Sequence, residues 1–432
     1  MAMMLDHRAS GFEAAFATLL SDERAAGADV RDAVTDILTD VRARGIPAVV
    51  ERTRLFDRWE ATAETLAFTE VEIDAAIARV PAAQRQALEL AAERIRAYHA
   101  RQMPQSAEWT DPQGATLGWR WTPVDAAGLY VPGGLASYPS SLLMNAIPAR
   151  VAGVRDLVVC APTPDGAVNP LVLLAARIAG VDRVFRIGGA QAIAALAFGA
   201  DPVPAVDKIT GPGNAYVAEA KRQVYGRVGI DMVAGPSEVL VIADAETDPD
   251  WVAIDLLAQA EHDERAQSIL ITDDAAFAEA VASAVERRLQ TLPRSAIAGA
   301  SWRAYGGIIT VADLADAASL ANRIAPEHLE LCVADPDALL AEIRHAGAVF
   351  LGRHTPEAIG DYVGGPNHVL PTAGSARFSS GLSVLDFLKR TTTARLTPAA
   401  IETIGPAAET LAASEGLDAH GLSVTLRRRA EA

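Results

Sequence analysis

Two adjacent residues, Glu327 and His328, have side chains that suit proton transfer. They follow an apolar stretch with helical spacing, ANRIA, and precede a second apolar run, LELCV, so we expect them at a helix-to-strand turn. A carboxyl group beside an imidazole can act as a general acid/base pair. The competing interpretation is a charge pair at a helix end, which the two residues taken alone favour.

A second group of residues could hold a metal ion. Gln259 and His262 are three residues apart in QAEHD, so on a helix they share a face and can converge on one ion, whereas Glu261 points elsewhere. An exposed polar helix end explains the same segment equally well. Further ligand-capable side chains lie outside the expected helices and strands, at Asp361, His368 and His420. The other histidines have polar neighbours and are expected at the surface: His7, His99, His345 and His354.

Glycine-proline turns recur beside expected strands, at Gly211–Asn214, Gly235–Glu238 and Gly365–His368. Glycine can adopt a positive φ and lets a ligand approach the backbone. Each turn alone is typical of a structural turn, but three of them, each with a hydrogen-bonding side chain, indicate a site. No G-x-G-x-x-G fingerprint occurs, so a dinucleotide would not use the usual phosphate loop, and spacing alone gives NAD little support.

Helix and strand patterns alternate from about residue 139 to about residue 351, as in PLVLLAARIAG followed by RVFRIGG. This alternation predicts mainly parallel sheets covered on both faces, in two successive doubly wound α/β domains. The first 100 or so residues are expected to be helical, residues 108–131 to form a short hairpin, and the stretch after about 380 to pack elsewhere, for example on a partner subunit. Ligands are expected beyond the carboxyl ends of the strands.

Composition excludes several classes of protein. The 432 residues carry a formal net charge of −17, which argues against a general nucleic-acid binder. No run of about 18 apolar residues is present and the first 20 residues do not resemble a signal peptide. The two cysteines, Cys160 and Cys332, lie in apolar runs and are expected to be buried and unreactive, so an aldehyde step would proceed through water. So few thiols are typical of a reducing compartment, and we expect a cytoplasmic protein.

Longer segments add to these short motifs. The chain closely resembles the histidinol dehydrogenase family in blocks that run in order from about residue 128 to 424: YVPGGLASYPSSLLMNAIPARVAGV, DKITGPGNAYVAEAKRQVYGRVGIDMVAGPSEVLVIAD, AQAEHDERAQSILIT, APEHLEL, GDYVGGPNHVLPTAGSARFSSGLSVLDFLKR and EGLDAHGLSV. The resemblance implies an NAD-dependent enzyme of histidine biosynthesis that oxidises L-histidinol through L-histidinal to L-histidine and reduces two NAD. It also implies a homodimer with one zinc ion per subunit.

The resemblance also implies roles for particular residues. Zinc would be held by Gln259, His262, Asp361 and His420, the last supplied by the tail of the partner. Substrate contacts would come from Ser237, Gln259, His262, His328, Asp361, His368, Glu415 and His420. NAD would contact Tyr130, Gln191 and Asn214. His328 would accept a proton in both oxidations, and Glu327 would activate the water that adds to the aldehyde.

For the domains, we expect two similar, incomplete Rossmann-type units with parallel sheets. Residues 1–25 would form an N-terminal helical arm, 26–129 with 236–380 the first unit with the zinc and acid/base residues, 130–235 the second unit with the NAD contacts, and 381–432 a dimerisation tail exchanged between subunits.

Three other functions compete with this one. A paralogous zinc- and NAD-dependent dehydrogenase, acting on another small alcohol such as a sulfonated diol, would keep the same apparatus. Glu415 favours histidinol, because its carboxylate could pair with the substrate ammonium. A zinc hydrolase with Glu327 as its base would not need Tyr130, Gln191 or Asn214 and would turn over without NAD. A non-catalytic binding protein would not need the acid/base pair.

Overall fold

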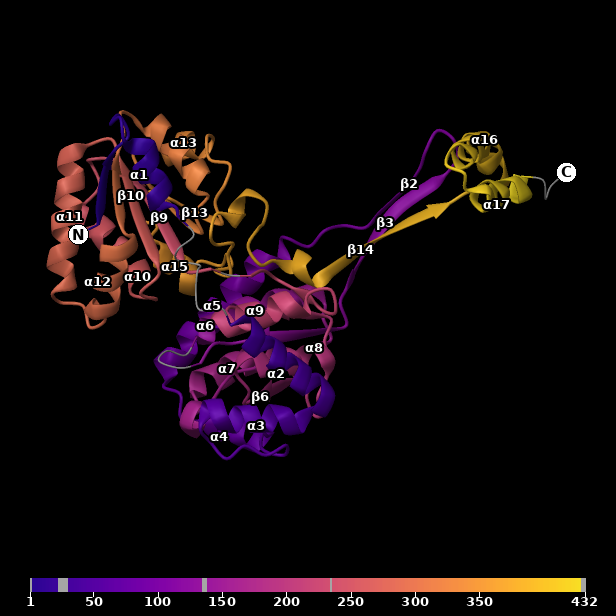
Figure 1. Ribbon diagram of the computed structural model, residues 1–432, viewed down its shortest axis with the longest axis horizontal. Coiled ribbons are helices and arrows are strands. Elements are labelled where there is room, and N and C mark those ends of the chain that lie inside the picture. The colour runs from indigo at the N-terminus through magenta and orange to yellow at the C-terminus, as the bar shows by residue number, and fades with distance from the viewer. Residues whose placement is uncertain (1, 22–29, 134–137, 234, 429–432) are drawn as a thin grey trace.

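The computed structural model describes residues 2–21, 30–133, 138–233 and 235–428. Two α/β bodies lie side by side, and a long arm that ends in two helices projects from them (Figure 1). The expected boundary between residues 25 and 26 lies outside the described residues.

The first body is built on a six-stranded, fully parallel sheet. In spatial order its strands are β1 (Met3–Asp6), β11 (Gly307–Thr310), β10 (Gln267–Thr272), β9 (Glu238–Ala243), β12 (His328–Cys332) and β13 (Ala348–Leu351). Alternate residues of β9 belong to different cores: Leu240 and Ile242 to one face, Val239 and Val241 to the other. Because both faces are covered, β9 and β10 are apolar runs rather than alternating patterns.

Helices cover both faces of this sheet. One face carries α10 (Pro249–Ala260), α11 (Ala275–Leu289) and α12 (Ser295–Tyr305), and the other carries α1 (Phe12–Leu19), α13 (Leu314–Ile324) and α14 (Pro336–Leu340). Residues 3–6, expected within a helical arm, are instead strand β1, which pairs with β11 at the sheet edge. Four residues are too few for a periodic pattern, so pairing with a neighbouring strand decides their conformation.

The second body holds a five-stranded parallel sheet. Its spatial order is β6 (Arg183–Phe185), β5 (Asp156–Cys160), β4 (Ala126–Tyr130), β7 (Lys208–Thr210) and β8 (Gly229–Ile230). The helices α6 (Pro139–Ala152) and α7 (Pro170–Ala179) cover one face, and α8 (Gly189–Phe198) and α9 (Ala215–Val224) the other. The chain moves outward from β4 to β6 and then returns to β7, so a topological switch point lies between β4 and β7, where doubly wound sheets bind ligands.

The N-terminal helices pack on this second body. They are α2 (Arg31–Arg44), α3 (Ile46–Asp57), α4 (Glu70–Ile77) and α5 (Ala82–Ala100), and they contact α8, α9, α7 and α6. Val34 and Val41 of α2, for example, share a buried cluster with Ile193 of α8. From the sequence, we expect residues 26–129 in one unit with residues 236–380. The structure instead packs the helices of residues 31–100 on the second body. An amphipathic pattern shows that a helix buries one face, but not which sheet receives that face. The division into domains as such stays a prediction.

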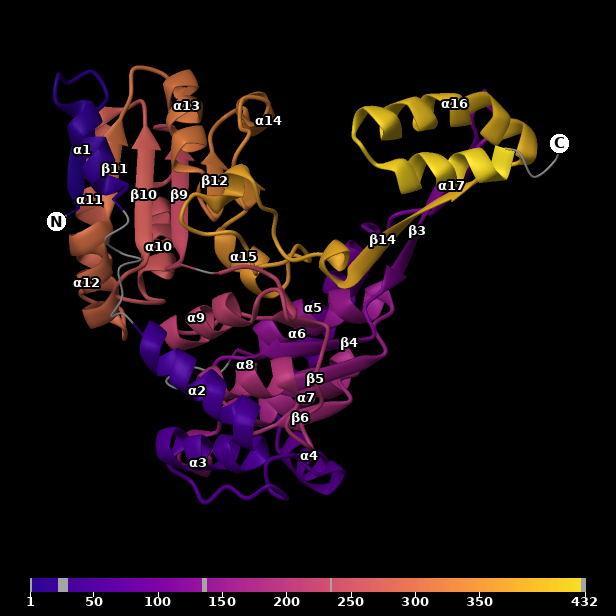
Figure 2. The same ribbon diagram turned by 45° about the vertical axis from the view of Figure 1, so that its right-hand side comes forward.

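The arm consists of an antiparallel sheet and a helix pair. Strand β3 (Thr116–Pro123) pairs with β2 (Ala107–Thr110), as expected for the hairpin, and with the distant β14 (Leu388–Arg395). Beyond them, α16 (Pro398–Ser414) packs on α17 (Asp418–Arg428) at the far end of the molecule (Figure 2). A short helix, α15 (Glu357–Tyr362), lies on the side of the first body that faces the second body (Figure 2).

Among the described helices, none combines the length and the apolar character that crossing a membrane requires.

Candidate active site

Glu327 and His328 lie at the turn between α13 and β12. Helix α13 ends at Ile324, its capping residue Ala325 adopts a left-handed φ of 50°, and β12 begins at His328 itself. Both side chains are buried, at 5% and 4% exposure, as a surface charge pair would not be. The backbone of one residue on the neighbouring strand, Glu238, holds them both: its N–H donates to Glu327 Oε2 at 2.9 Å, and its carbonyl oxygen lies 3.0 Å from His328 Nδ1.

This pair lies at the amino-terminal edge of the six-stranded sheet. His328 and Glu238 are the first residues of β12 and β9, and the arrowheads of β9 and β10 point away from the second body (Figure 2). The expectation that the chemistry lies beyond the carboxyl ends of the strands is therefore wrong for the acid/base pair. The reason is that the amino edge of this sheet faces the second body, so the space between the bodies is bordered by that edge.

Burial controls the charge of the pair. It raises the pKa of the Glu327 carboxyl well above its usual range, and a hydrogen bond from Ser237 acts against that rise. It also lowers the pKa of His328 to about 4, although Asp361 and the Glu238 carbonyl favour the protonated ring. His328 is therefore neutral at neutral pH. Its Nε2 has no hydrogen-bond partner among the residues that the structure describes.

A row of carboxyl groups behind His328 was missed in the sequence. Glu357 Oε1 lies 3.5 Å from His328 Nδ1, and the Glu357 N–H donates to Glu330 Oε1 at 2.6 Å. Burial raises the pKa of both carboxyls well above the usual range, and it raises that of the neighbouring Asp255 to about 6. Glu357 precedes Asp361 by four residues, one helical turn, and that spacing is the signal that could have found it.

Gln259 and His262 meet as their spacing predicts. Gln259 Nε2 and His262 Nδ1 are 3.5 Å apart where α10 ends. Gln259 is fully buried, yet its Oε1 has no partner in the described parts of the chain. A buried, unpartnered amide oxygen is costly unless a ligand such as a metal ion completes it, so this residue fits a metal site.

Asp361 joins the same region. Its carboxylate acts electrostatically on His328 and His368, and so does the ring of His262. Ligand atoms of His328, Glu357 and Asp361 also lie within 4.8 Å of one another. His328 Nδ1 faces a carbonyl oxygen and so carries the ring proton, which leaves only Nε2 available to an ion. We therefore keep Asp361 in the expected ligand set, which stays a prediction.

His368 connects the two bodies. Its Nε2 lies 3.1 Å from the hydroxyl of Ser141 on α6, and its Nδ1 lies 3.0 Å from the carbonyl oxygen of Asp361 on α15. Ser237, another expected substrate contact, hydrogen bonds to Glu327. The expected substrate residues Ser237, His328, Asp361 and His368 thus border one region.

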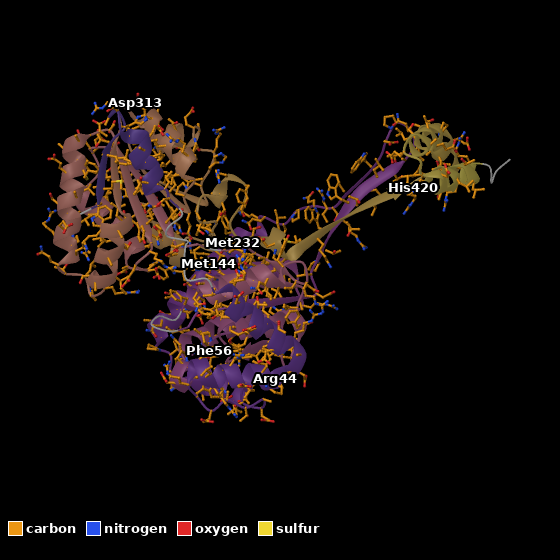
Figure 3. The ribbon with its side chains drawn as sticks, in the orientation of Figure 1. Arg44, Phe56, Met144, Met232, Asp313 and His420 are labelled. Carbon is orange, nitrogen blue, oxygen red and sulfur yellow. The ribbon has the colours of Figure 1, made fainter. Side chains whose placement is uncertain are left out.

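Two expected site residues lie elsewhere in the chain. Glu415 caps the C-terminal end of α16 and His420 lies in α17, both exposed on the arm. His420 is far from Met144 and Met232, which lie where the two bodies meet (Figure 3). Within one chain the structure does not bring Glu415 or His420 to the other site residues.

The three residues expected to contact NAD converge at the switch point of the five-stranded sheet. Tyr130 ends β4, and its hydroxyl accepts a hydrogen bond from the Gly189 N–H at 3.1 Å, at the start of α8. Gln191 on α8 is 1% exposed, and neither atom of its amide has a partner in the described segments. Asn214 caps α9 by accepting from two backbone N–H groups. Helix N-termini at a switch point suit the phosphates of a dinucleotide, and an unpartnered buried amide suits a ligand, so these residues fit NAD.

Two further expectations concern cysteines and histidines. Cys160 and Cys332 are buried, as expected, and burial raises the pKa of Cys160 to about 12. His99 was expected at the surface but is fully buried, with Nδ1 2.9 Å from the Ile95 carbonyl and Nε2 3.3 Å from Asn367 Nδ2. Its polar sequence neighbours line the exposed side of α5, so they do not report on the face that carries His99.

The two parallel sheets, the dinucleotide-type switch point and the buried Glu–His pair define an α/β dehydrogenase. The family model described as histidinol dehydrogenase matches residues 20–428. Histidinol dehydrogenases of Cereibacter sphaeroides and Ruegeria pomeroyi are 70% and 69% identical, with 99% of this chain covered and 98% and 99% of theirs. The crystal structure of histidinol dehydrogenase from Elizabethkingia anophelis matches with a TM-score of 0.94 at 36% identity, over 99% of this chain and 98% of that one. The chain belongs to the histidinol dehydrogenase family.

Proposed function

We propose that this chain oxidises L-histidinol through L-histidinal to L-histidine and reduces two NAD, the last steps of histidine biosynthesis. The observation that carries the proposal is the buried, neutral His328, whose Nε2 is free to accept a proton beside the protonatable Glu327. The relatives of this chain support histidinol oxidation over the activity of a paralogous dehydrogenase, because proteins up to 70% identical to it are named histidinol dehydrogenase.

In the alcohol oxidation, His328 Nε2 accepts the hydroxyl proton as hydride leaves the same carbon and the carbonyl bond forms. The imidazolium is then stabilised by the charge of Asp361 and by the Glu238 carbonyl oxygen, which lies 3.0 Å from Nδ1. In the aldehyde oxidation, Glu327 in its ionised form accepts a proton from water while the water oxygen bonds to the aldehyde carbon, and the protonated His328 returns its proton to the aldehyde oxygen. His328, neutral again, then accepts a hydroxyl proton as the hydrate loses hydride. Water is the nucleophile because both cysteines are buried thiols whose pKa is raised.

For the metal, we propose zinc held by Gln259, His262, Asp361 and His420. An amide oxygen, two imidazoles and a carboxylate suit Zn²⁺, and the unpartnered Gln259 Oε1 supports the assignment. When bound, the ion would orient the substrate through its nitrogen atoms. Ser237, His328, His368 and Glu415 would contact the substrate with these ligands.

For the cofactor, we propose that Tyr130, Gln191 and Asn214 contact NAD. The convergence of these three residues where β4, α8 and α9 meet supports this assignment. NAD accepts the two hydrides when bound.

For the assembly, we propose a homodimer in which the arm of each subunit reaches the other. His420 and Glu415 lie on the arm, away from the remaining site residues (Figure 3). A second copy could supply them, because its arm would bring α17 to the space between the two bodies. The compartment also remains a proposal: two buried free thiols are typical of a reducing environment, so we expect the cytoplasm.

Substrate competition tests the function against its nearest alternative. The zinc-loaded protein is assayed with NAD on L-histidinol and on a sulfonated propanediol. We expect kcat/KM to favour L-histidinol by at least about 10⁴-fold, because a site built to hydrogen bond its polar groups rejects an analogue that lacks them. A preference for the sulfonated diol would support the paralogous dehydrogenase.

A further inference from the structure

A buried ion pair in the second body has no place in the acid/base chemistry. Lys221 on α9 and Asp231, which follows β8, form a salt bridge with side chains that are 3% and 1% exposed. Taking two charges out of water is costly, and well-packed apolar residues often replace such a pair without loss of stability. A buried pair is therefore weak evidence for stability by itself, so its other contacts are informative.

Both charges hold the peptide groups of one residue, Gly211. The Gly211 N–H donates to Asp231 Oδ2 at 2.8 Å, and Lys221 Nζ donates to the Gly211 carbonyl oxygen at 3.0 Å. Hydrogen bonds to charged groups are stronger than those between neutral groups. The pair therefore fixes Gly211 from both sides.

Gly211 occupies a position that only glycine can take. Its φ is +115°, and a Cβ there would lie 2.0 Å from the carbonyl oxygen of Tyr130. The loop thus passes directly against the end of β4, and three residues later Asn214 caps the N-terminus of α9. A shift of Gly211 would move Asn214 relative to Tyr130, on opposite sides of the switch point.

We propose that Lys221 and Asp231 are positioning residues that hold the Gly211–Asn214 loop in the conformation that binds NAD. The inference rests on the proposed NAD site at Tyr130, Gln191 and Asn214. Neither charge contacts the cofactor: both act through the Gly211 backbone. The chain has no G-x-G-x-x-G turn. In its place, the ion pair fixes the backbone of Gly211, and Gly211 in turn fixes the path of the loop that leads to the N-terminus of α9.

The test uses Lys221→Met, which removes the charge at similar length, in the full-length protein. NAD binding is measured by calorimetry without substrate, together with KM for NAD and KM for L-histidinol. We expect Kd and KM for NAD to rise about tenfold, which corresponds to the loss of one charged hydrogen bond, and KM for L-histidinol to change less than about twofold. Amide hydrogen exchange in residues 211–214 should become faster.

A double variant separates positioning from stability. Removing one charge leaves the other buried and alone, so Lys221→Met should lower the unfolding temperature. Lys221→Met with Asp231→Leu replaces both charges and should recover much of that loss. If the pair positions the loop, NAD binding stays weak in the double variant. Recovery of both stability and NAD affinity would overturn the proposal, and so would an unchanged NAD Kd in Lys221→Met.

Arg150→Met is the matched control at the other edge of the same sheet. Arg150 donates to the carbonyl oxygens of Gly180, Val154 and Arg155 and pairs with Asp182, away from the switch point. Arg150→Met should lower the unfolding temperature and leave the Kd for NAD unchanged. If it raised that Kd as much as Lys221→Met does, the effect of Lys221 would be one of general stability, and the proposal would be overturned. Wild-type protein that binds NAD but does not oxidise L-histidinol would instead refute the proposed function, but it would not contradict the positioning role of Lys221 and Asp231.

Discussion

His328 Nδ1 lies 3.0 Å from the carbonyl oxygen of Glu238, whose N–H holds the carboxyl of the preceding Glu327. A carbonyl oxygen can only accept, so this contact places the ring proton on Nδ1 and leaves a lone pair on Nε2. One residue of strand β9 therefore sets both the tautomer of the proposed base and the orientation of its neighbour. The consequences can be measured.

His328→Asn should slow both oxidations by about 10²–10⁴-fold, because asparagine keeps a donor toward the Glu238 carbonyl but cannot accept the substrate proton. Rates are measured separately with L-histidinol and with L-histidinal, and bound zinc is measured by elemental analysis. Zinc content should equal that of the wild type. His354→Asn, an exposed histidine, is the control. Loss of zinc in His328→Asn would mean that this residue is a ligand rather than a base.

Glu327→Gln should impair the oxidation of L-histidinal about 10²-fold or more and that of L-histidinol far less. Glutamine retains an oxygen that can accept from the Glu238 N–H, so the fold should be kept, but it cannot accept a proton from water. Presteady-state kinetics with each substrate measures the two steps. Equal damage to both steps would contradict the assignment of the water to Glu327.

Exchange of the arm between subunits predicts complementation. His420→Ala and His328→Asn should each be inactive alone. In a mixed dimer, one site would combine both defects and the other would have His328 from one chain and His420 from its partner. Co-expression with two affinity tags and purification of the mixed dimer should therefore give about half of the wild-type activity, by the counting of symmetric sites. An inactive mixed dimer would place His420 in the site of its own chain.

Asp255→Asn should make the protein more stable at neutral and alkaline pH. Burial raises the pKa of Asp255 to about 6 in the folded state, from 3.8 in the unfolded state, so the folded protein binds more protons in this range. Stability from this group is complete below pH 3.8 and is lost as pH rises through 6. The variant lacks that loss and should gain about 3 kcal/mol above pH 7, and nothing below pH 4.

Urea unfolding at several pH values measures this difference. Asp36→Asn, at an exposed position of α2, serves as the control and should follow the wild type. If the free energy of unfolding depended on pH in the same way for Asp255→Asn and the wild type, the pKa of Asp255 would not be raised in the folded state.

Much of the fold could be predicted from periodicity. Runs such as EVLVIA and QSILIT are strands because parallel sheets covered on both faces need unbroken apolar segments. Periodicity could not show which sheet receives helix α2, since an apolar stripe fits any apolar surface. It also could not reveal strand β1, whose four residues depend on pairing with β11.

The site was predictable where short spacing determines geometry, as for Gln259 and His262 near one helix end. It was not predictable where distant segments meet. Glu357 approaches His328 only because α15 lies beside β12, and Lys221 reaches Gly211 only because α9 folds back over the loop. The edge of the sheet that carries His328 follows from how the two bodies face each other, which no local pattern encodes.

The most direct test of the account is the number of NADH molecules formed for each L-histidinol molecule consumed. Zinc-loaded protein is incubated with limiting L-histidinol and excess NAD, NADH is followed by absorbance, and L-histidinol and histidine are quantified by chromatography. A water-dependent second oxidation by Glu327 and His328 predicts a ratio of two. A ratio of one, with L-histidinal accumulating, or histidine formed without NADH, would contradict it.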